Sequence, residues 1–306
     1  MKKYLQDRVA IVTGAGSGLG RAHAMELARQ GARVVVNDIG GAQAGSPGRA
    51  VADEINRAGG MAMAVGGDVT QHAAMEDMVA QVIETWGRVD ILVNNAGILR
   101  DKSFAKMSLG DFRQVMEVHL MGSVHCIKAV WETMRAQRYG RIVMTTSSSG
   151  LYGNFGQANY SAAKMALVGL MQTLALEGER YGIRVNCLAP TAATAMTQGV
   201  LTEEALAHLA PAAVSPALVA LVGEDAPTRR ILLAGGGSVE SANITMTAGI
   251  FVGNALESTS DAATAIRGRM PEILDRDGER VPATGFEQCQ FELEKAGVEM
   301  ALPGAA

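Results

Sequence analysis

Short runs of β-branched and other apolar residues alternate along this chain with longer segments that have the apolar spacing of a helix. Strands that are apolar throughout and separated by helices are typical of a parallel sheet covered on both faces. The runs begin at residues 8, 33, 62, 89, 140, 183 and 230, and the helical segments include residues 21–30, 75–86, 111–137 and 161–181. The alternation predicts an α/β fold over residues 1–250, a doubly wound parallel sheet of the Rossmann type.

The remaining residues, 251–306, have a less regular pattern and form a predicted C-terminal extension. One amphipathic helix is expected over residues 286–295, after the turn-rich stretch DRDGERVPATG. Two interpretations of the extension stay open. Either it packs on the outside of the helices that cover the sheet, or it folds over a substrate entrance, its own or a partner subunit's.

The composition argues against several classes of function. Against 31 Asp and Glu there are only 27 Lys and Arg, a formal net charge of −4 without a basic block, so no nucleic acid partner is expected. No stretch reaches the roughly 18 apolar residues of a membrane helix, and the first residues do not form a signal peptide. We therefore expect a cytoplasmic protein. The cysteines, Cys126, Cys187 and Cys289, show no metal spacing, and no HExxH occurs, so no metal site is expected.

A glycine-rich stretch, TGAGSGLG at residues 13–20, follows the first predicted strand. The pattern G-x-G-x-x-G fails when counted from Gly14, because Leu19 occupies the third glycine position, whereas T-G-x-x-x-G-x-G fits. Backbone without side chains lets amide groups and a helix N-terminus approach a pyrophosphate. The predicted dinucleotide contacts from this loop are Gly14, Ser17, Gly18, Leu19 and Gly20.

An acidic residue, Asp38, ends the second predicted strand in VVVND. A carboxylate at this position accepts hydrogen bonds from an adenosine ribose and repels a 2′-phosphate, which favours NAD over NADP as the cofactor. Alternatively, Asp38 only forms a turn ahead of Gly40 and Gly41. Further expected cofactor contacts close the third and fourth strands, namely Asp68, Val69, Asn94, Ala96 and Gly97.

The pentapeptide YSAAK places Tyr160 and Lys164 four residues apart at the start of a predicted helix. Residues with this spacing share a helix face, so the ammonium can lie near the phenol. A phenol that acts as a base near neutrality needs a pKa shift of about three units, or roughly 4 kcal/mol. A cation about 4 Å away supplies roughly that much at an effective dielectric constant near 20. The other interpretation is a helix-end aromatic residue beside a solvated lysine.

The order and spacing of TGxxxGxG, NNAG, Ser147 and Tyr160-x-x-x-Lys164 resemble the short-chain dehydrogenase/reductase family across about residues 5–250. Within that family, the stretches VVVNDIGG, LVNNAGILRDKSF and YGNFGQANYSAAK are similar to the (3R)-hydroxyacyl-CoA dehydrogenase domains of peroxisomal multifunctional enzymes. Stand-alone bacterial dehydrogenases of steroid catabolism look similar too. The resemblance implies that Tyr160 is the general base, that Lys164 serves both the phenol and the cofactor ribose, and that Ser147 orients the substrate oxygen.

Two residues depart from the family's usual pattern. His119 stands where the family has an asparagine that supports a proton relay behind the lysine, and it either takes over the relay or is a core histidine. Pro190 is followed by Thr191 in place of the family's glycine, so Pro190 is the expected contact on the nicotinamide side. A slip of one or two residues would select Ser148 or Ser149 in place of Ser147.

The resemblance implies an NAD-dependent interconversion of a secondary alcohol and a ketone, on a 3-hydroxyacyl-CoA that can carry a steroid-derived acyl group. The alternatives are a free steroid oxidised at C17, and a dinucleotide sensor without catalysis. Because both substrates are long and apolar, residues 194–209 are either a lid or an ordinary packed helix. Family members commonly pair through the helices expected at residues 111–137 and 161–181, so we expect a homodimer or homotetramer.

Overall fold

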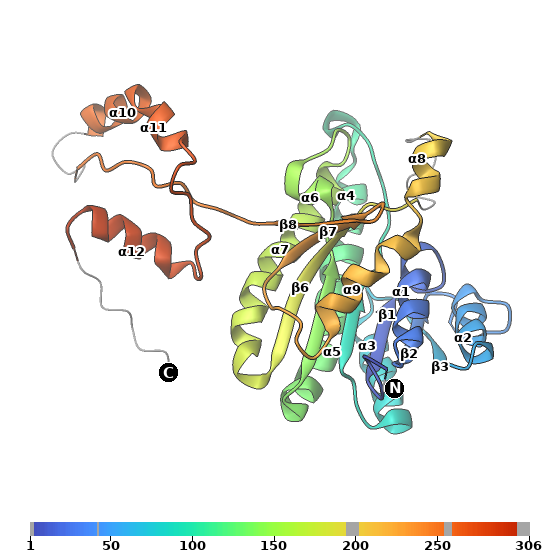
Figure 1. The fold of residues 1–306 in the computed structure, drawn as a ribbon. Helices are drawn as coiled ribbons and strands as arrows, with labels where there is room; N and C mark the ends of the chain where they lie inside the picture. Colours follow the sequence, from blue (N-terminus) through green and yellow to red (C-terminus); the bar gives the residue numbers. More distant parts are fainter. Residues whose placement is uncertain (1–2, 42, 194–201, 254–258, 299–306) are drawn as a thin grey trace. The chain divides into compact units, whose positions relative to one another are not determined.

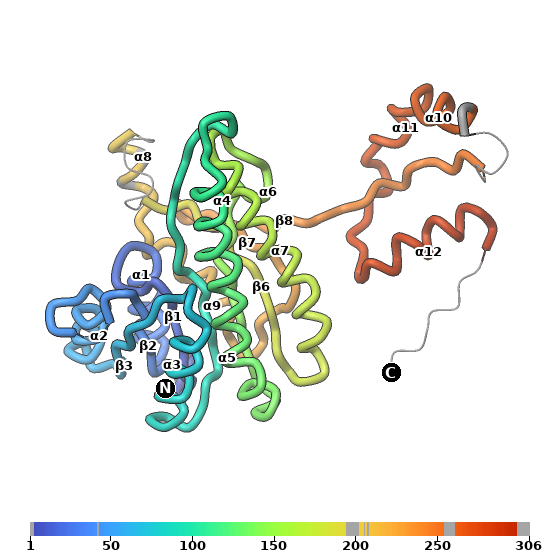
Figure 2. The backbone as a smooth tube through the Cα atoms, turned by 180° about the vertical axis from the view of Figure 1, so that it is seen from behind, coloured from blue at the N-terminus to red at the C-terminus, as the bar shows by residue number. Residues whose placement is uncertain are grey.

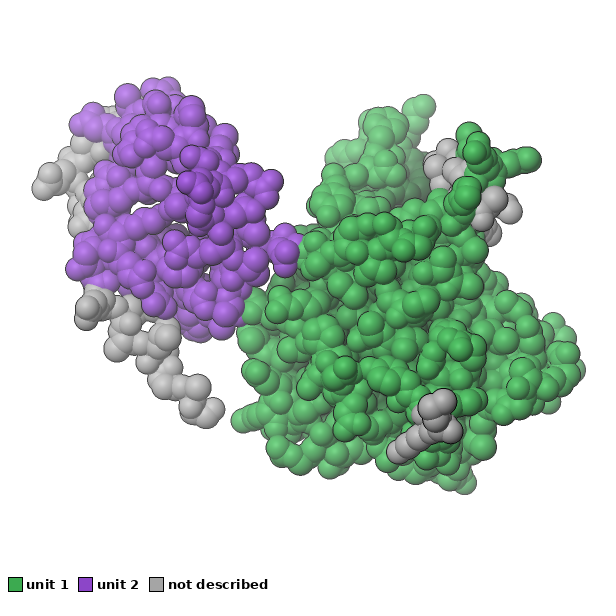
Figure 3. Space-filling view, in the orientation of Figure 1, with its two compact units in different colours: residues 1–242 green, residues 243–306 purple. Residues whose placement is uncertain are grey.

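The computed structural model describes residues 3–41, 43–193, 202–253 and 259–298. The chain divides into two compact units, Met1–Ala242 and Asn243–Ala306 (Figure 3). The candidate site residues predicted from the sequence all belong to the first unit.

The first unit is built on one eight-stranded sheet with the order β3-β2-β1-β4-β5-β6-β7-β8 (Figure 1). All neighbouring strands from β3 to β7 pair in parallel. The strand order reverses between β1 and β4, and in such sheets ligands bind at the carboxyl ends of the strands beside this point. The predicted doubly wound α/β fold is confirmed. The strands are β1 (Val9–Thr13), β2 (Arg33–Asp38), β3 (Met61–Gly66), β4 (Ile91–Asn94), β5 (Gly140–Thr145), β6 (Ile183–Pro190), β7 (Ile231–Gly235) and β8 (Ser238–Ala242).

Helices cover both faces of this sheet, and Figure 2 shows the face that Figure 1 places behind. Alternate residues of β1 point to opposite faces. Ala10 and Val12 join a buried cluster with α1, α2 and α9, whereas Val9 and Ile11 join a second cluster with α3, α5 and α7. The main helices are α1 (Gly18–Arg29), α2 (Pro47–Arg57), α3 (His72–Trp86), α5 (Gly122–Gln137), α7 (Ala158–Gly178) and α9 (Ser215–Val222).

The sheet is not entirely parallel, which corrects one part of the sequence prediction. Strand β8 runs antiparallel to β7 at the edge of the sheet. Gly236 and Gly237 form the connection with φ of +58° and +85°, the left-handed conformations that a two-residue hairpin turn requires. The sequence SVESA was not recognised as a strand because its first four side chains are exposed and its apolar residues do not alternate.

The predicted helix over residues 111–137 is interrupted in the structure. It consists of α4 (Leu109–Met116), a π-helical turn η2 (Glu117–Met121) and α5. Helix α2 was not predicted, although Ser46 caps it by accepting a hydrogen bond from the Arg49 backbone and Pro47 occupies its first turn. The shorter elements are η1 (Phe104–Lys106), α6 (Ser148–Tyr152), η3 (Glu179–Tyr181), α8 (Glu203–His208) and η4 (Pro211–Ala213).

The second unit contains three helices in its described part, α10 (Thr259–Gly268), α11 (Met270–Leu274) and α12 (Phe286–Lys295). The helix predicted at residues 286–295 is therefore confirmed. Met246 and Arg280 form an isolated antiparallel bridge, and the Arg280 guanidinium stacks over the Phe291 ring at 4.0 Å. Across the described residues of both units, none of the helices combines the length and the apolar character that a membrane crossing needs.

Candidate active site

The glycine-rich loop connects β1 to α1 at the carboxyl end of the central strand. Gly14 has a φ of +60°, a conformation that side chains disfavour. A Cβ atom on Gly20 would lie 2.2 Å from the Gly14 carbonyl oxygen and 2.5 Å from the Asn95 amide nitrogen. The loop is therefore folded back onto the first turn of α1, which also carries Gly18 and Leu19 and follows the N-cap residue Ser17.

Two residues that the sequence analysis did not select, Thr13 and Asn95, hold this loop in place. The Asn95 side chain donates to the carbonyl oxygens of Thr13 at 3.0 Å and Gly14 at 3.2 Å. The Thr13 hydroxyl accepts the backbone N–H groups of Asn95 and Ala96, at 3.0 Å and 3.1 Å. These bonds join the glycine loop to the NNAG turn after β4. The doubled asparagine of NNAG was the signal that pointed to this role.

Asp38 lies at the end of β2 beside the glycine loop. Its Oδ2 accepts a hydrogen bond from the Gly16 backbone N–H at 2.9 Å. The side chain thus lies at the carboxyl end of β2 beside the glycine loop. The Asp38 carbonyl oxygen also accepts the Gly41 backbone N–H at 3.1 Å, so Asp38 forms the turn ahead of Gly41 as well. Asp68 follows the end of β3, and its carboxylate accepts a hydrogen bond from the Thr70 backbone N–H at 2.9 Å. The adjacent Val69 is buried against Gly122.

The side-chain amide of Asn94 is buried at the end of β4, and neither of its polar atoms has a hydrogen-bond partner among the described residues. A buried polar group without a partner costs free energy, so a polar ligand is its natural complement. Pro190 lies at the end of β6, two strands away in the same sheet. The predicted cofactor contacts thus lie at the carboxyl ends of the parallel strands, where such sheets bind dinucleotides.

The predicted catalytic residues meet between β5 and α7. Ser147 is the N-cap of α6 and accepts a hydrogen bond from the Ser149 backbone at 3.1 Å. The Ser147 hydroxyl lies close enough to the Tyr160 phenol to lower its pKa. Lys164, one helical turn after Tyr160 on α7, is fully enclosed and donates to the Thr145 carbonyl oxygen at 2.5 Å. Of the three candidate serines, Ser147 is the one in contact with Tyr160.

Burial shifts the pKa values of both Tyr160 and Lys164, an effect that the sequence analysis did not include. Burial raises the pKa of the Tyr160 phenol above 10.0, while the nearby Ser147 hydroxyl lowers it and the charge of Asp101 raises it. Burial lowers the pKa of Lys164 to about 7, so this lysine is only partly protonated at neutral pH. Its Nζ lies 5.4 Å from the centre of the Tyr160 ring. Burial is thus the main cause of the Tyr160 shift and acts against the lowering of the pKa that Lys164 is expected to provide, and that lowering stays a prediction.

His119 is carried by the π-helical turn η2 and is buried beside Tyr160. Its ring meets the Tyr160 ring edge-on, with centroids 5.2 Å apart and an interplanar angle of 87°. Its Nε2 lies 2.8 Å from the Ile98 carbonyl oxygen, and a Cβ atom on Gly97 would lie 2.2 Å from its Cε1. Burial, together with the Lys164 charge, lowers the pKa of His119 to about 3. The imidazole is therefore neutral and fixes the backbone after NNAG next to Tyr160.

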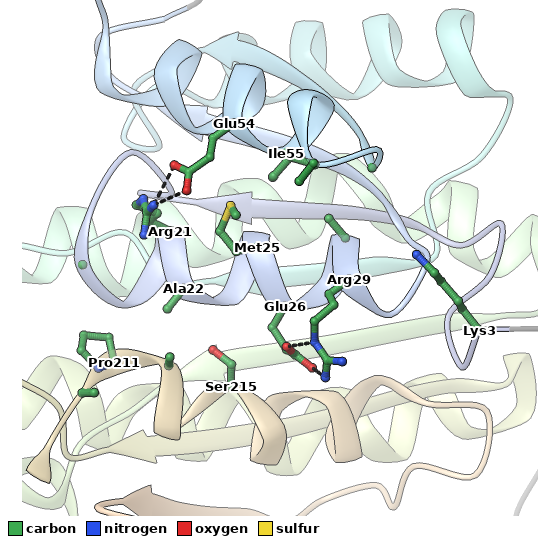
Figure 4. Close-up of a pocket in the computed structure, with 16 residues that line it drawn as sticks. Lys3, Arg21, Ala22, Met25, Glu26, Arg29, Glu54, Ile55, Pro211 and Ser215 are labelled. Atoms are coloured by element: carbon green, nitrogen blue, oxygen red, sulfur yellow. Dashed lines mark hydrogen bonds and ion pairs between the residues drawn. The ribbon is translucent and has the colours of Figure 1, made fainter.

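A separate hollow of about 650 Å³ opens on the outer side of α1 (Figure 4). Met25 of α1, Ile55 of α2 and Ser215 of α9 line it, and the Arg21–Glu54 ion pair crosses it at 2.7 Å. Of the predicted site residues only Gly18 contributes to its wall. The hollow is thus distinct from the constellation around Tyr160.

A family model described as short chain dehydrogenase matches residues 8–205 of the chain. The chain belongs to the short-chain dehydrogenase family. A protein of Mycobacterium tuberculosis named as a short-chain type dehydrogenase/reductase is 48% identical over 242 residues, 77% of this chain and 85% of its own length. A hydroxy(phenyl)methylsuccinyl-CoA dehydrogenase subunit of Thauera aromatica is 42% identical over 186 residues, 61% of this chain and 73% of its own.

Two solved structures extend this similarity. Full-length peroxisomal multifunctional enzyme type 2 from Drosophila melanogaster aligns with a TM-score of 0.79 and 34% identity, covering 95% of this chain and 50% of that one. This chain thus spans half of that longer enzyme. A 7α-hydroxysteroid dehydrogenase complexed with NADH and 7-oxo glycochenodeoxycholic acid aligns with a TM-score of 0.69 and 32% identity, covering 76% and 95%.

As a short-chain dehydrogenase, the chain is an oxidoreductase, and its family binds a nicotinamide dinucleotide. The residues present fit such a group. The glycine loop supplies free backbone for a pyrophosphate, Asp38 stands beside it, and the amide of Asn94 lacks a partner within the described chain.

Proposed function

We propose that this protein interconverts a secondary alcohol and a ketone with NAD as the cofactor, and that its substrate is a 3-hydroxyacyl-CoA. The observation that carries the proposal is the juxtaposition of Ser147, just after β5, with Tyr160 and Lys164 on α7, where buried Lys164 donates to the Thr145 carbonyl oxygen. These side chains lie at the same end of the sheet as the glycine loop, the carboxyl ends of the parallel strands. The thioester is favoured because one relative is named as a hydroxy(phenyl)methylsuccinyl-CoA dehydrogenase subunit.

Each residue then has a defined task. Ser147 donates a hydrogen bond to the substrate oxygen, and Tyr160 accepts the alcohol proton. A bound NAD would supply the acceptor for the hydride and a positive charge. Lys164 holds its ammonium near the ribose and near Tyr160, while neutral His119 keeps the Ile98 backbone in place. The proposal includes a proton relay through His119. The atom that would carry the proton is Nδ1, which is buried and has no hydrogen-bond partner among the described residues.

The preference for NAD over NADP is inferred from Asp38. Its carboxylate lies against the Gly16 backbone, where a 2′-phosphate would meet a negative charge. The wild-type protein should have a higher kcat/KM with NAD than with NADP, and Asp38→Ala should narrow that ratio. A higher kcat/KM of the wild-type protein with NADP would contradict the inference.

A free 17β-hydroxysteroid is the second candidate substrate, because one of the similar structures is a hydroxysteroid dehydrogenase. The two candidates are separated by following the absorbance of NADH as it forms, with a 3-hydroxyacyl-CoA and with a 17β-hydroxysteroid side by side. We expect turnover with the thioester at a kcat/KM at least about tenfold higher. A preference for the steroid would reject the thioester.

Oligomeric state and location remain predictions. Pairing through α5 and α7 is inferred because family members pair through these helices and α7 exposes apolar residues, among them Met165 and Leu176. Light scattering at micromolar concentration should therefore report a dimer or tetramer. The cytoplasmic location also stays a prediction. Of the predicted lid, residues 194–201 lie outside the described residues, and the rest contains α8.

A further inference from the structure

The loop between β4 and α4 borders the candidate site and is fixed to the segment that leads into Tyr160. The Asn159 side chain donates to the Arg100 carbonyl oxygen at 3.1 Å. The Lys102 backbone N–H donates to the Gly156 carbonyl oxygen at 2.9 Å. The Gln157 amide donates to the Asp101 carboxylate at 2.6 Å. Three hydrogen bonds therefore hold residues 100–102 beside the entrance to the catalytic helix.

This loop exposes more positive than negative charge. Arg100, Lys102 and Lys106 are all exposed. Lys102 is neutralised by Asp111 at 2.9 Å, and Asp101 is bound by Gln157. Arg100 and Lys106 form no ion pair with any carboxylate among the described residues. The loop thus carries two cations without an ion-pair partner among the described residues, in a protein whose formal net charge is −4. Besides the Lys102 hydrogen bond, the charge of Arg100 also helps to lower the pKa of Asp111.

Three aromatic side chains are exposed in this loop and in the segment hydrogen-bonded to it. Phe104 is 76% exposed, Phe155 is 92% exposed and Tyr152 is 70% exposed. Within the described part of the first unit, Tyr4 is the other exposed aromatic residue. Exposed apolar groups gathered at one place mark a binding surface. Aromatic rings next to unpaired cations suit a ligand that joins a flat ring system to phosphate groups.

We propose that Arg100 and Lys106 bind the phosphate groups of coenzyme A in the acyl-CoA substrate, with Phe104 against its adenine ring. This inference rests on the proposed function and specifies how the carrier half of the thioester is recognised. Guanidinium and ammonium groups form charge-assisted hydrogen bonds with phosphate oxygens. A free steroid has no phosphate, so this loop would contribute nothing to its binding.

The test compares two thioesters with the same acyl group. These are 3-hydroxydecanoyl-CoA and the 3-hydroxydecanoyl thioester of N-acetylcysteamine, which lacks every phosphate. In the variant Arg100→Glu/Lys106→Glu, KM for the CoA ester should rise at least about tenfold, because two attractive contacts become repulsive. The kcat should stay within about twofold. KM for the short thioester should not change, and its turnover also shows that the variant is folded.

A matched control makes the same change of charge elsewhere. Arg57 and Lys3 are exposed and form no ion pair among the described residues, so Arg57→Glu/Lys3→Glu should leave both KM values unchanged. Added salt should raise KM for the CoA ester in the wild-type protein and have less effect in the loop variant.

The outcomes separate this inference from the proposed function. If the wild-type protein oxidises neither thioester, the proposed function fails. If it oxidises both, but the loop variant keeps the wild-type KM for the CoA ester, the inference is overturned and the proposed function stands. Equal increases of KM for both thioesters also overturn it, because they would show a structural role for the loop.

Discussion

At the scale of single residues, the phenol oxygen of Tyr160 is the atom on which the proposed proton transfer depends. Tyr160→Phe removes that oxygen and keeps the ring that packs against His119. Turnover should fall by at least about 10²-fold, the usual contribution of a positioned acid or base. NAD affinity, measured by fluorescence titration, should stay within about twofold. Tyr4→Phe, at an exposed position before β1, is the control and should keep wild-type turnover. A loss below about tenfold for Tyr160→Phe would reject the assigned role.

Lys164 gives a prediction about stability and pH. Its folded-state pKa is lowered to about 7 from 10.5, so between these values the unfolded chain binds more protons and stability rises with pH. Below about pH 7 both states are protonated and the folded state bears the cost of a buried charge.

Lys164→Met removes that cost, and it removes the bond to Thr145 at every pH. The melting temperature of the variant minus that of the wild type should therefore be more positive at about pH 6 than at about pH 10. The difference should be at least about 2–4 °C, the shift that 1 kcal/mol produces in a domain of this size. Lys128→Met, on the exposed side of α5, should show no such difference. The same melting-temperature change at both pH values would contradict the buried charge.

At the scale of elements, the junction of the glycine loop and α1 is predicted to tolerate no side chain. Gly20→Ala would place a Cβ atom 2.2 Å from the Gly14 carbonyl oxygen, which belongs to the backbone and cannot rotate away. The free energy of unfolding should fall by about 1–3 kcal/mol, and the affinity for NAD should fall because the loop must shift.

Gly110→Ala, near the start of another helix, is the control for Gly20→Ala. Gly110 is exposed near the start of α4, and a Cβ atom there would have Ser108 Oγ as its nearest neighbour, 3.7 Å away. Alanine should leave stability unchanged or increase it by up to about 1 kcal/mol. Urea unfolding and NAD titration of both variants decide the question. Equal stability of the two variants would show that the loop moves freely.

At the scale of the whole molecule, the open question is the role of the second unit, Asn243–Ala306. Its helices expose apolar residues, including Leu274 of α11 and Phe286 of α12. We expect the unit to wall off a substrate entrance, its own or a partner's, since a long acyl chain needs a large apolar surface. Deleting residues 243–306 should raise KM for a long-chain 3-hydroxyacyl-CoA more than for a short-chain one, without changing NAD affinity. An equal loss for both substrates, with a lower melting temperature, would show that the unit is structural.

The sequence by itself determined the order of strands and helices, because burial on both faces of a parallel sheet requires apolar runs that can be read directly. Its motifs also singled out Tyr160, Lys164 and Asp38 as candidates, because their spacing places them at a strand end or on one helix face, and the family resemblance singled out Ser147. Residue contacts between distant segments were decided only by the tertiary structure. The bracing of the glycine loop by Asn95, the burial that lowers the pKa of Lys164 and the position of His119 beside Tyr160 all belong to this class. Strand β8 does as well, because its pairing with β7 comes from a hairpin and its exposed side chains carry no periodic signal. A local sequence pattern shows which side chains of a segment are buried. How strongly a titratable group is desolvated, and which residues it contacts, depends on which distant segments the fold brings together.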